Sequence, residues 1–295
     1  MFEAAVYLST SCFGNVPLAD ALRLCQKNRI FHVELSGPHP FEPVQKVRSI
    51  LAGYRQKGFS FTVHNYFPPQ SHDFILNIAS LDSNIRAKTE CMVGEALTIA
   101  EEVGSPIYGI HSGYLSDGKV GSNGIFIFSS RKQDVSASLR QASGFIDSLI
   151  KKNNRISIIL ENLFPAVEEN HSLACTVEEI KELLSLLPEE AGLLLDLGHL
   201  SITSRMLGFD KFLFLEKYLR AFGVRVREVH ISENSGLRDE HLPLSEDSWQ
   251  LKALSEINSI PVTDALPRVF CLEARNSSDM ASLKSSIELI RDNVC

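Results

Sequence analysis

The chain has 295 residues and a formal net charge of −7, from 36 acidic and 29 basic side chains. Apolar residues make up 44% and charged residues 22%, proportions that exclude a disordered or collagen-like chain. The acidic balance disfavours a protein that coats nucleic acid or an anionic membrane.

Eight short apolar segments punctuate the sequence, and we expect each to be a strand. They span residues 4–9, 32–35, 60–64, 106–111, 155–161, 192–196, 226–230 and 269–273. Most are continuously apolar, which is typical of parallel strands buried on both faces. Helical patterns fill the intervals, at residues 17–29, 41–57, 82–103, 135–150, 176–187, 210–222, 246–259 and 280–290.

Eight β-α units in succession favour a closed (β/α)8 TIM barrel in the α/β class. No linker-like stretch or change of composition indicates a second domain, so we expect one domain over residues 1–295. The longest irregular stretches are 65–75, 112–133 and 231–247, and each follows a strand. They should therefore lie at the C-terminal face of the strands, where the active sites of such barrels are found.

The segment composition also bears on location. No apolar run is long enough to span a bilayer, and the first residues lack the basic and apolar regions of a signal peptide. The six cysteines are scattered without a Cys-x-x-Cys pair, as expected for reduced thiols. We therefore expect a cytoplasmic protein with no membrane partner.

Polar residues at the strand ends carry the functional signal. Almost every predicted strand ends in, or is soon followed by, a histidine or a carboxylate: Glu34, His64, His111, Glu161, Asp196 with His199, His230 with Asp239 and His241, and Glu273. Each alone could be a hydrogen-bonded structural residue. Together in one barrel mouth they are unfavourable unless cations compensate their charge. Imidazole and carboxylate donors without cysteine suit Zn²⁺, Mn²⁺, Co²⁺ or Fe²⁺, so we predict a divalent metal site.

The same residues lie in the segments FTVHNY, IILEN, LLLDLGH, REVHISEN and FCLEAR. In these motifs the whole chain resembles the xylose isomerase-like TIM-barrel superfamily, which includes endonuclease IV and many sugar isomerases and epimerases. The resemblance implies the metal set that the isomerases and epimerases share, here Glu161, Asp196, His230 and Glu273. The three-metal set of endonuclease IV would add His64, His111, His199, Asp239 and His241. It therefore implies two or three ions per chain, with zinc or manganese favoured.

The motifs divide between the branches of the superfamily. Residues 65–69 read NYFPP where endonuclease IV has a Ser-Tyr pair, and residues 196–199 read DLGH where it has Asp-Thr-Cys-His. Residues 238–243, RDEHLP, resemble proteins named sugar phosphate isomerase/epimerase, although Ser-Glu-Asp replaces their usual Gly-Glu-Gly at 245–247. The branch of the isomerases and epimerases is therefore favoured.

On this interpretation the substrate is a small sugar or sugar phosphate. The resemblance implies that Glu161 and Glu273 bind metal and move a proton at the carbon next to the substrate carbonyl. We expect further substrate contacts from Glu34, Tyr66, Asn162, Arg238 and Arg275. A homodimer is compatible with the sequence.

Two other functions stay open. One is an endonuclease IV-like zinc phosphodiesterase that acts on abasic-site DNA. The strand-end loops mix acidic with basic residues and form no basic track, which disfavours nucleic acid without excluding it. The other is a metal-binding barrel without catalysis, against which the complete donor set argues.

Overall fold

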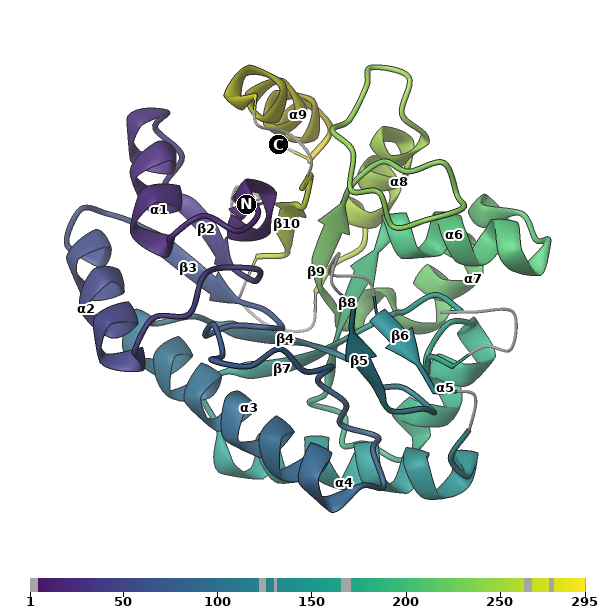
Figure 1. Cartoon of the computed structure of the whole chain (residues 1–295). Coiled ribbons are helices and arrows are strands. Elements are labelled where there is room, and N and C mark those ends of the chain that lie inside the picture. Colours follow the sequence, from purple (N-terminus) through teal and green to yellow (C-terminus); the bar gives the residue numbers. More distant parts are fainter. Residues whose placement is uncertain are drawn as a thin grey trace.

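Eight parallel strands close into a barrel, which confirms the predicted TIM-barrel fold (Figure 1). The computed structural model describes residues 5–121, 126–129, 132–165, 171–262, 267–275 and 279–294. The strand order around the barrel is β1-β10-β9-β8-β7-β4-β3-β2. The bounds of the strands are β1 Ala5–Ser9, β2 His32–Leu35, β3 Ser60–Val63, β4 Ile107–His111, β7 Ser157–Glu161, β8 Gly192–Asp196, β9 Val226–Ile231 and β10 Val269–Leu272. Ala4, at the predicted start of the first strand, lies outside the described residues.

Helices surround the barrel (Figure 1). They are α1 Leu18–Lys27, α2 Val44–Arg55, α3 Ser83–Val103, α4 Val135–Lys152, α5 Val177–Ser185, α6 Leu197–Leu207, α7 Lys211–Phe222, α8 Trp249–Asn258 and α9 Met280–Val294, with short 3-10 turns η1 Thr10–Phe13 and η2 Gly223–Arg225. Side-chain caps fix several starts: Asp82 and Asp134 accept backbone hydrogen bonds at α3 and α4, and Thr176 forms a capping box with Glu179 at α5. Within the described residues, no helix has the length and apolar character needed to cross a membrane.

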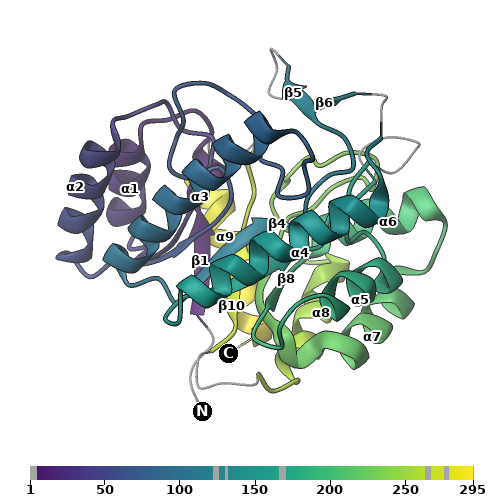
Figure 2. The same ribbon diagram turned by 90° about the horizontal axis from the view of Figure 1, so that it is seen from below.

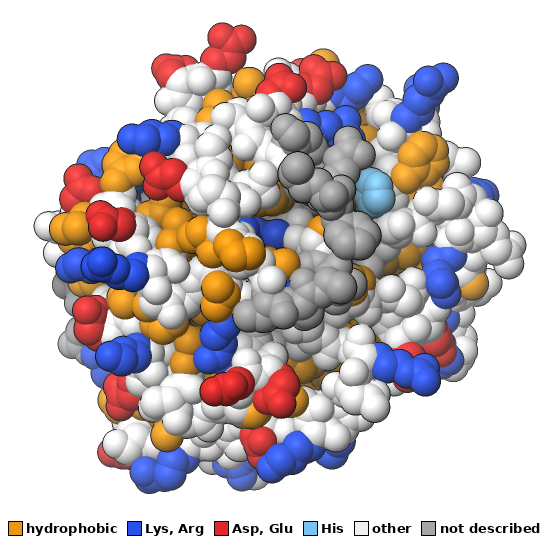
Figure 3. All heavy atoms as spheres, turned by 180° about the vertical axis from the view of Figure 1, so that it is seen from behind, with side chains coloured by type: hydrophobic (Ala, Val, Ile, Leu, Met, Phe, Trp, Pro, Cys, Tyr) orange, Lys and Arg blue, Asp and Glu red, His pale blue; other side chains and the backbone are white. Residues whose placement is uncertain are grey.

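One helix and one pair of strands were not predicted from the sequence. Helix α6 begins directly after β8, with Asp196 as its N-cap, where we expected no helix. Strands β5 (Gly118–Val120) and β6 (Phe126–Phe128) form an antiparallel pair inside the stretch 112–133 that we expected to be irregular. Figure 2 shows this pair projecting beyond one end of the barrel. Figure 3 shows the molecule from behind, where acidic and basic side chains are interspersed around the rim.

The barrel interior is layered because alternate residues of each strand face the same side. One layer is apolar and includes Tyr7, Ile107, Ile159 and Leu194. Two residues further along β7 and β8, and four residues further along β4, the strands end in Glu161, Asp196 and His111. The register pairs His111 with Glu161, and Asp196 with His230. The fold therefore places the predicted donors on neighbouring strands at one level.

Arg268 joins several chain segments around β10. The guanidinium is almost fully buried and donates to the carbonyl oxygens of Val226 (2.9 Å), Gly223 (3.0 Å), Ile260 (3.1 Å) and Ile257. These carbonyls belong to the start of β9, to η2 and to the end of α8. Hydrogen bonds to a buried charged donor contribute more to stability than those on the surface.

We expect Arg268→Met to lower the free energy of unfolding by about 3 kcal/mol, because the buried carbonyls lose their donor. Urea denaturation measures the change. Arg23→Met is the control, since its side chain is 70% exposed and pairs only with Asp20; it should change stability by less than about 0.5 kcal/mol. Equal effects of the two substitutions would contradict this account of Arg268.

Candidate metal centre

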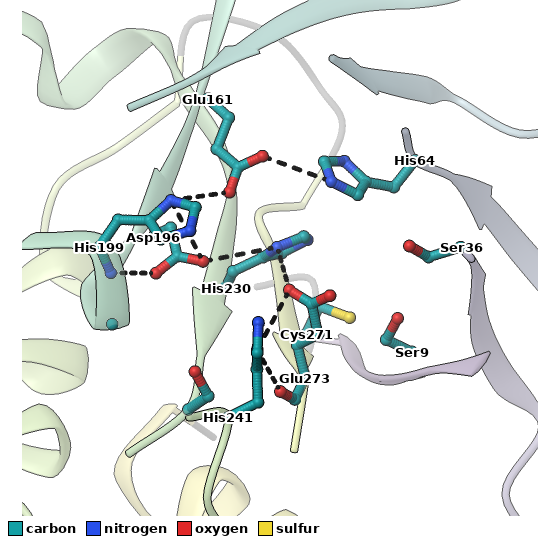
Figure 4. A network of polar contacts seen from close by, with 12 residues as sticks. Ser9, Ser36, His64, Glu161, Asp196, His199, His230, His241, Cys271 and Glu273 are labelled. Atoms are coloured by element: carbon teal, nitrogen blue, oxygen red, sulfur yellow. Dashed lines mark hydrogen bonds and ion pairs between the residues drawn. The ribbon is translucent and has the colours of Figure 1, made fainter. Parts of the chain in front are cut away.

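The carboxyl ends of four consecutive barrel strands, β7 to β10, bring four donors together (Figure 4). Glu161 and Asp196 are the last residues of β7 and β8, His230 lies near the end of β9, and Glu273 follows β10 directly. All four are buried, with at most 3% of each residue exposed. His64, directly after β3, points toward Glu161 from across the barrel (Figure 4).

One cluster of donors surrounds Glu161. Its Oε2 atom lies 3.3 Å from Nε2 of His64 and 3.2 Å from Nε2 of His111. Ligand atoms bonded to one tetrahedral ion at about 2.1 Å are about 3.4 Å apart. Each of the two imidazole nitrogens therefore lies at ligand-to-ligand spacing from the same carboxylate oxygen.

Two further clusters lie beside the first. Nδ1 of His230 is 3.2 Å from Oε2 of Glu273 and 3.9 Å from Oδ2 of Asp196. In the third cluster, Oδ2 of Asp239 is 3.7 Å from Nε2 of His199 and 2.6 Å from Nε2 of His241. Nδ1 of His199 is also 3.1 Å from Oε1 of Glu161, which connects the third cluster to the first. All nine predicted ligand positions thus come together in one site.

Among the described residues, several buried donor atoms in this site have no hydrogen-bond partner and contact only other donors of the site. They are Oε2 of Glu161, Nδ1 of His230, Oδ1 of Asp239 and Nε2 of His241. A buried polar atom without a partner is unfavourable, and in native proteins it calls for a water, an ion or a ligand. Carboxylate oxygens and imidazole nitrogens are ligands of zinc and manganese, so the residues present fit divalent cations.

The pKa shifts in these clusters also indicate that the site lacks positive charge. Burial lowers the pKa of His111 to about 3 and holds that of His64 well below its usual value, so both rings are neutral. Burial also raises the pKa of Glu161 to about 7, although His199 opposes the rise. Burial opposes charge on His199 too, yet the carboxylates of Asp196 and Glu161 outweigh it and raise the pKa of His199 well above its usual value. The protons on Glu161 and His199 thus supply positive charge that bound metal cations would otherwise supply.

Two predicted substrate-binding residues contact the protein around the donors. The amide of Asn162 donates to the carbonyl of Asp196 at 3.0 Å and accepts from its N–H at 2.7 Å, which fixes the end of β8. Glu34 is fully buried and hydrogen-bonds Nε2 of His230 at 2.8 Å. Such a carboxylate orients a metal-binding imidazole and leaves its other nitrogen, Nδ1, for the ion. Substrate binding by Asn162 and Glu34 stays an untested prediction.

The other predicted substrate residues lie at different depths. Tyr66 is packed edge-on against the rings of His111 and Phe126. Arg275 donates to Oε1 of Glu273 at 2.7 Å, with 41% of its side chain exposed. Arg238 is exposed. The structure thus brings Tyr66 and Arg275 to the donor clusters, while Arg238 lies at the surface of the loop that carries Asp239.

Sequence reasoning missed three supports of the site. Ser11 donates to Oε1 of Glu273 at 3.1 Å, and the hydroxyl of Tyr114 lies 2.9 Å from Nδ1 of His111. Gly109 lies where a Cβ would be 2.6 Å from Nδ1 of His64. A glycine inside a buried strand is a sequence signal of close approach, and this one precedes His111 by two residues. The serine and the tyrosine carry no such signal.

Comparison with known proteins agrees with this geometry. The sequence pattern of the family described as "Xylose isomerase-like TIM barrel" matches residues 22–292. The chain belongs to this family. The family's fold is the one observed here, and its match covers every donor of the three clusters.

Individual relatives of the xylose isomerase-like barrel are distant. The uncharacterised protein MJ1311 of Methanocaldococcus jannaschii is 26% identical over 231 residues, which cover 74% of this chain and 69% of that protein. A D-tagatose 3-epimerase-like protein has a TM-score of 0.71 at 21% identity, covering 98% of this chain and 99% of its own. Endonuclease IV from Thermus thermophilus has a TM-score of 0.59 at 15% identity, covering 98% of each chain. At these identities the two structures show a shared fold.

We expect Gly109→Ala to weaken metal binding by about 10-fold to 100-fold, because the new methyl group displaces the ring of His64. Competition with a chromophoric chelator measures the affinity. Gly94→Ala is the matched control, since nothing lies within 4 Å of a Cβ added there in α3. Unchanged affinity in Gly109→Ala would show that His64 is not a ligand.

We also expect metal affinity to rise with pH through the neutral range. Binding requires ionised Glu161, whose pKa is about 7 without metal, and neutral His199, whose pKa is raised. Protons therefore compete with the ion below these values, and affinity should increase by more than about 10-fold between about pH 6 and about pH 8. Calorimetric titration in buffers of different ionisation enthalpy also counts the protons released. A flat profile would contradict direct binding by these groups.

Proposed function

We propose that the protein is a divalent-metal-dependent isomerase or epimerase of a sugar or sugar phosphate. One observation carries the proposal: two buried carboxylates, Glu161 and Glu273, flank Asp196 and His230 on four consecutive strands. Epimerisation next to a carbonyl needs one group to remove a proton and another to return it, from two sides of the same carbon. Glu161 and Glu273 are the pair in this site that meets that need.

In this proposal Glu161, Asp196, His230 and Glu273 hold the ion. When bound, a divalent cation supplies a Lewis acid that polarises the substrate carbonyl and favours ionised carboxylates. Burial opposes ionisation of Glu273, but Arg275, His241 and His230 together outweigh it and hold the pKa of Glu273 well below its usual value. Glu273 is therefore ready to accept a proton, and Glu161, with a pKa of about 7, can hold or release one at neutral pH.

Aromatic side chains form one wall beside the donors. The ring of Tyr66 contacts His111 and Phe126, and Tyr114 contacts His111 and Phe128. A wall of rings excludes water and suits the apolar C–H face of a sugar. We assign Tyr66 to the binding of substrate carbon and Arg275 to its oxygen substituents.

A second function, metal-dependent hydrolysis of a phosphodiester, is favoured by the third donor cluster. His199, Asp239 and His241 exceed what one ion for proton transfer requires, and several ions together suit an in-line displacement at phosphorus. The loops at this end of the barrel offer little for a long polyanion, because basic residues alternate with acidic ones. These loops include Lys119, Lys132 and Arg238 beside Asp73, Asp117, Glu233, Glu240 and Glu246.

We expect Glu161→Gln and Glu273→Gln each to lower turnover by about 100-fold to 10,000-fold, because an amide can neither accept nor deliver the proton. Exchange of substrate C–H protons with deuterated water, followed by NMR over a panel of ketoses, aldoses and their phosphates, measures the reaction. Glu182→Gln, on the exposed face of α5, is the control.

The same protein should be assayed for incision of an oligonucleotide with one abasic site. Proton exchange that survives His241→Gln supports the isomerase, since the third cluster is not needed for it. Metal-dependent incision at low enzyme concentration, lost in His241→Gln and unaccompanied by proton exchange, would replace the isomerase with the hydrolase. If the fully metal-loaded protein shows neither activity, the result would favour a binding function.

A further inference from the structure

A second group of donors lies deeper in the barrel and shares His230 with the donors in the mouth. It comprises Glu34 on β2, Glu228 and His230 on β9, and Cys271 on β10, and one ligand atom from each lies within 4.8 Å of all the others. None of the four residues has measurable exposure. Glu228 precedes His230 by two residues and Cys271 precedes Glu273 by two, so both point into the barrel one layer below the donors in the mouth.

Three of the four carboxyl oxygens in this group are unpaired among the described residues. Both carboxyl oxygens of Glu228 and Oε1 of Glu34 have no hydrogen-bond partner among the described residues. The only ion pair of Glu34 within that part of the chain is with His230, and Glu228 has none. Two carboxyl groups buried side by side with three unpaired oxygens are strongly unfavourable without a compensating cation.

Among the residues described, His230 is the group that can place positive charge beside these carboxyl groups, through Nε2 at 2.8 Å from Glu34, and one imidazolium cannot balance both of them. The layer packed around Cys271 is apolar and contains Tyr7, Ile107, Ile159 and Leu194. Burial raises the pKa of Glu228 well above its usual value, and the nearby carboxylate of Glu34 raises it further. The raised pKa indicates the same lack of positive charge around these carboxyl groups. The thiol of Cys271 has only a long contact, 3.9 Å to the carbonyl of Leu272.

We propose that Glu34, Glu228, His230 and Cys271 form a second, closed site for a dication of the zinc type. Carboxylate, imidazole and thiolate are all zinc ligands, and four protein ligands without an open position are the mark of a structural rather than a catalytic site. His230 would present Nε2 to this ion, while Nδ1 faces Glu273 and Asp196 in the mouth. The ion takes the place of the protons on the thiol, on the carboxyl of Glu228 and on Nε2, which pass to solvent.

Such a site would tie β2, β9 and β10 together beneath the mouth and hold the ring of His230 from behind. The inference does not depend on the reaction proposed above. Three of its four ligands, Glu34, Glu228 and Cys271, lie outside the metal set of the mouth, and His230 is the one that both sets share. It also has its own spectroscopic readout, since it is the one donor group found in the described residues that includes sulfur. A thiolate bound to Co²⁺ gives an intense near-ultraviolet charge-transfer band that carboxylates and imidazoles do not give.

The experiment uses the full chain, stripped of metal and reloaded with Co²⁺ alone. We expect the charge-transfer band in the parent protein and in Cys91→Ser, which removes an exposed thiol, and its loss in Cys271→Ser. Elemental analysis after zinc loading should find one equivalent less in Cys271→Ser and in Glu228→Gln than in the parent. Glu182→Gln is the matched control for loss of a surface carboxyl.

Circular dichroism of the metal-free proteins establishes that each variant is folded. If Cys271→Ser does not fold, zinc X-ray absorption on the parent protein decides the matter, because a bound thiolate gives a Zn–S distance of about 2.3 Å. A parent protein without the band or without zinc–sulfur scattering would overturn the proposal. So would a band that persists in folded Cys271→Ser, or an unchanged metal content in both variants.

Discussion

The structure depends on one electrostatic constraint: carboxylates from neighbouring strands are confined in a space without enough protein cations. Glu161, Asp196 and Glu273 are buried in the mouth. Among the described residues, Arg275 is the one arginine that forms an ion pair with any of these carboxylates, and its partner is Glu273. In its metal-free form the protein meets the deficit with protons, on His199 and at the raised pKa of Glu161. A buried cluster of this composition could bind metal cations in place of those protons.

The barrel is what makes this confinement possible. Parallel strands joined in register deliver their last residues to one level, so His111 faces Glu161 and Asp196 faces His230. Gly109 has no side chain and therefore leaves room for the ring of His64. The hydrogen bond that His230 donates to Glu34 and the one that Asn162 donates to the backbone of Asp196 then hold the donors in place.

The sequence predicted the strands, and through them most of the donors, because a buried strand that ends in a histidine or a carboxylate is a local pattern. It did not predict α6, since DLGHLSITS contains a glycine and two β-branched residues where Asp196 both ends β8 and caps the helix. The pair β5–β6 depends on contacts of Phe126 and Phe128 with Tyr114, which no local pattern announces. The deeper group behind His230 escaped notice because Glu228 and Cys271 lie within apolar runs, and only closure of the barrel brings Glu34 to them.

The number of ions in the mouth sets the sign of its field, and thereby the class of substrate it attracts. Glu161, Asp196, Asp239 and Glu273 outweigh the single charge of Arg275 by three negative charges when the histidines are neutral ligands. One dication leaves the mouth negative, which suits a neutral sugar whose carbonyl meets the ion and whose proton moves to a carboxylate. Three dications would make the net charge of the mouth positive, and this positive charge would favour binding of a phosphate. In the two functions proposed above, the third cluster, His199 with Asp239 and His241, would therefore be the part of the site whose occupancy separates proton transfer from phosphodiester hydrolysis.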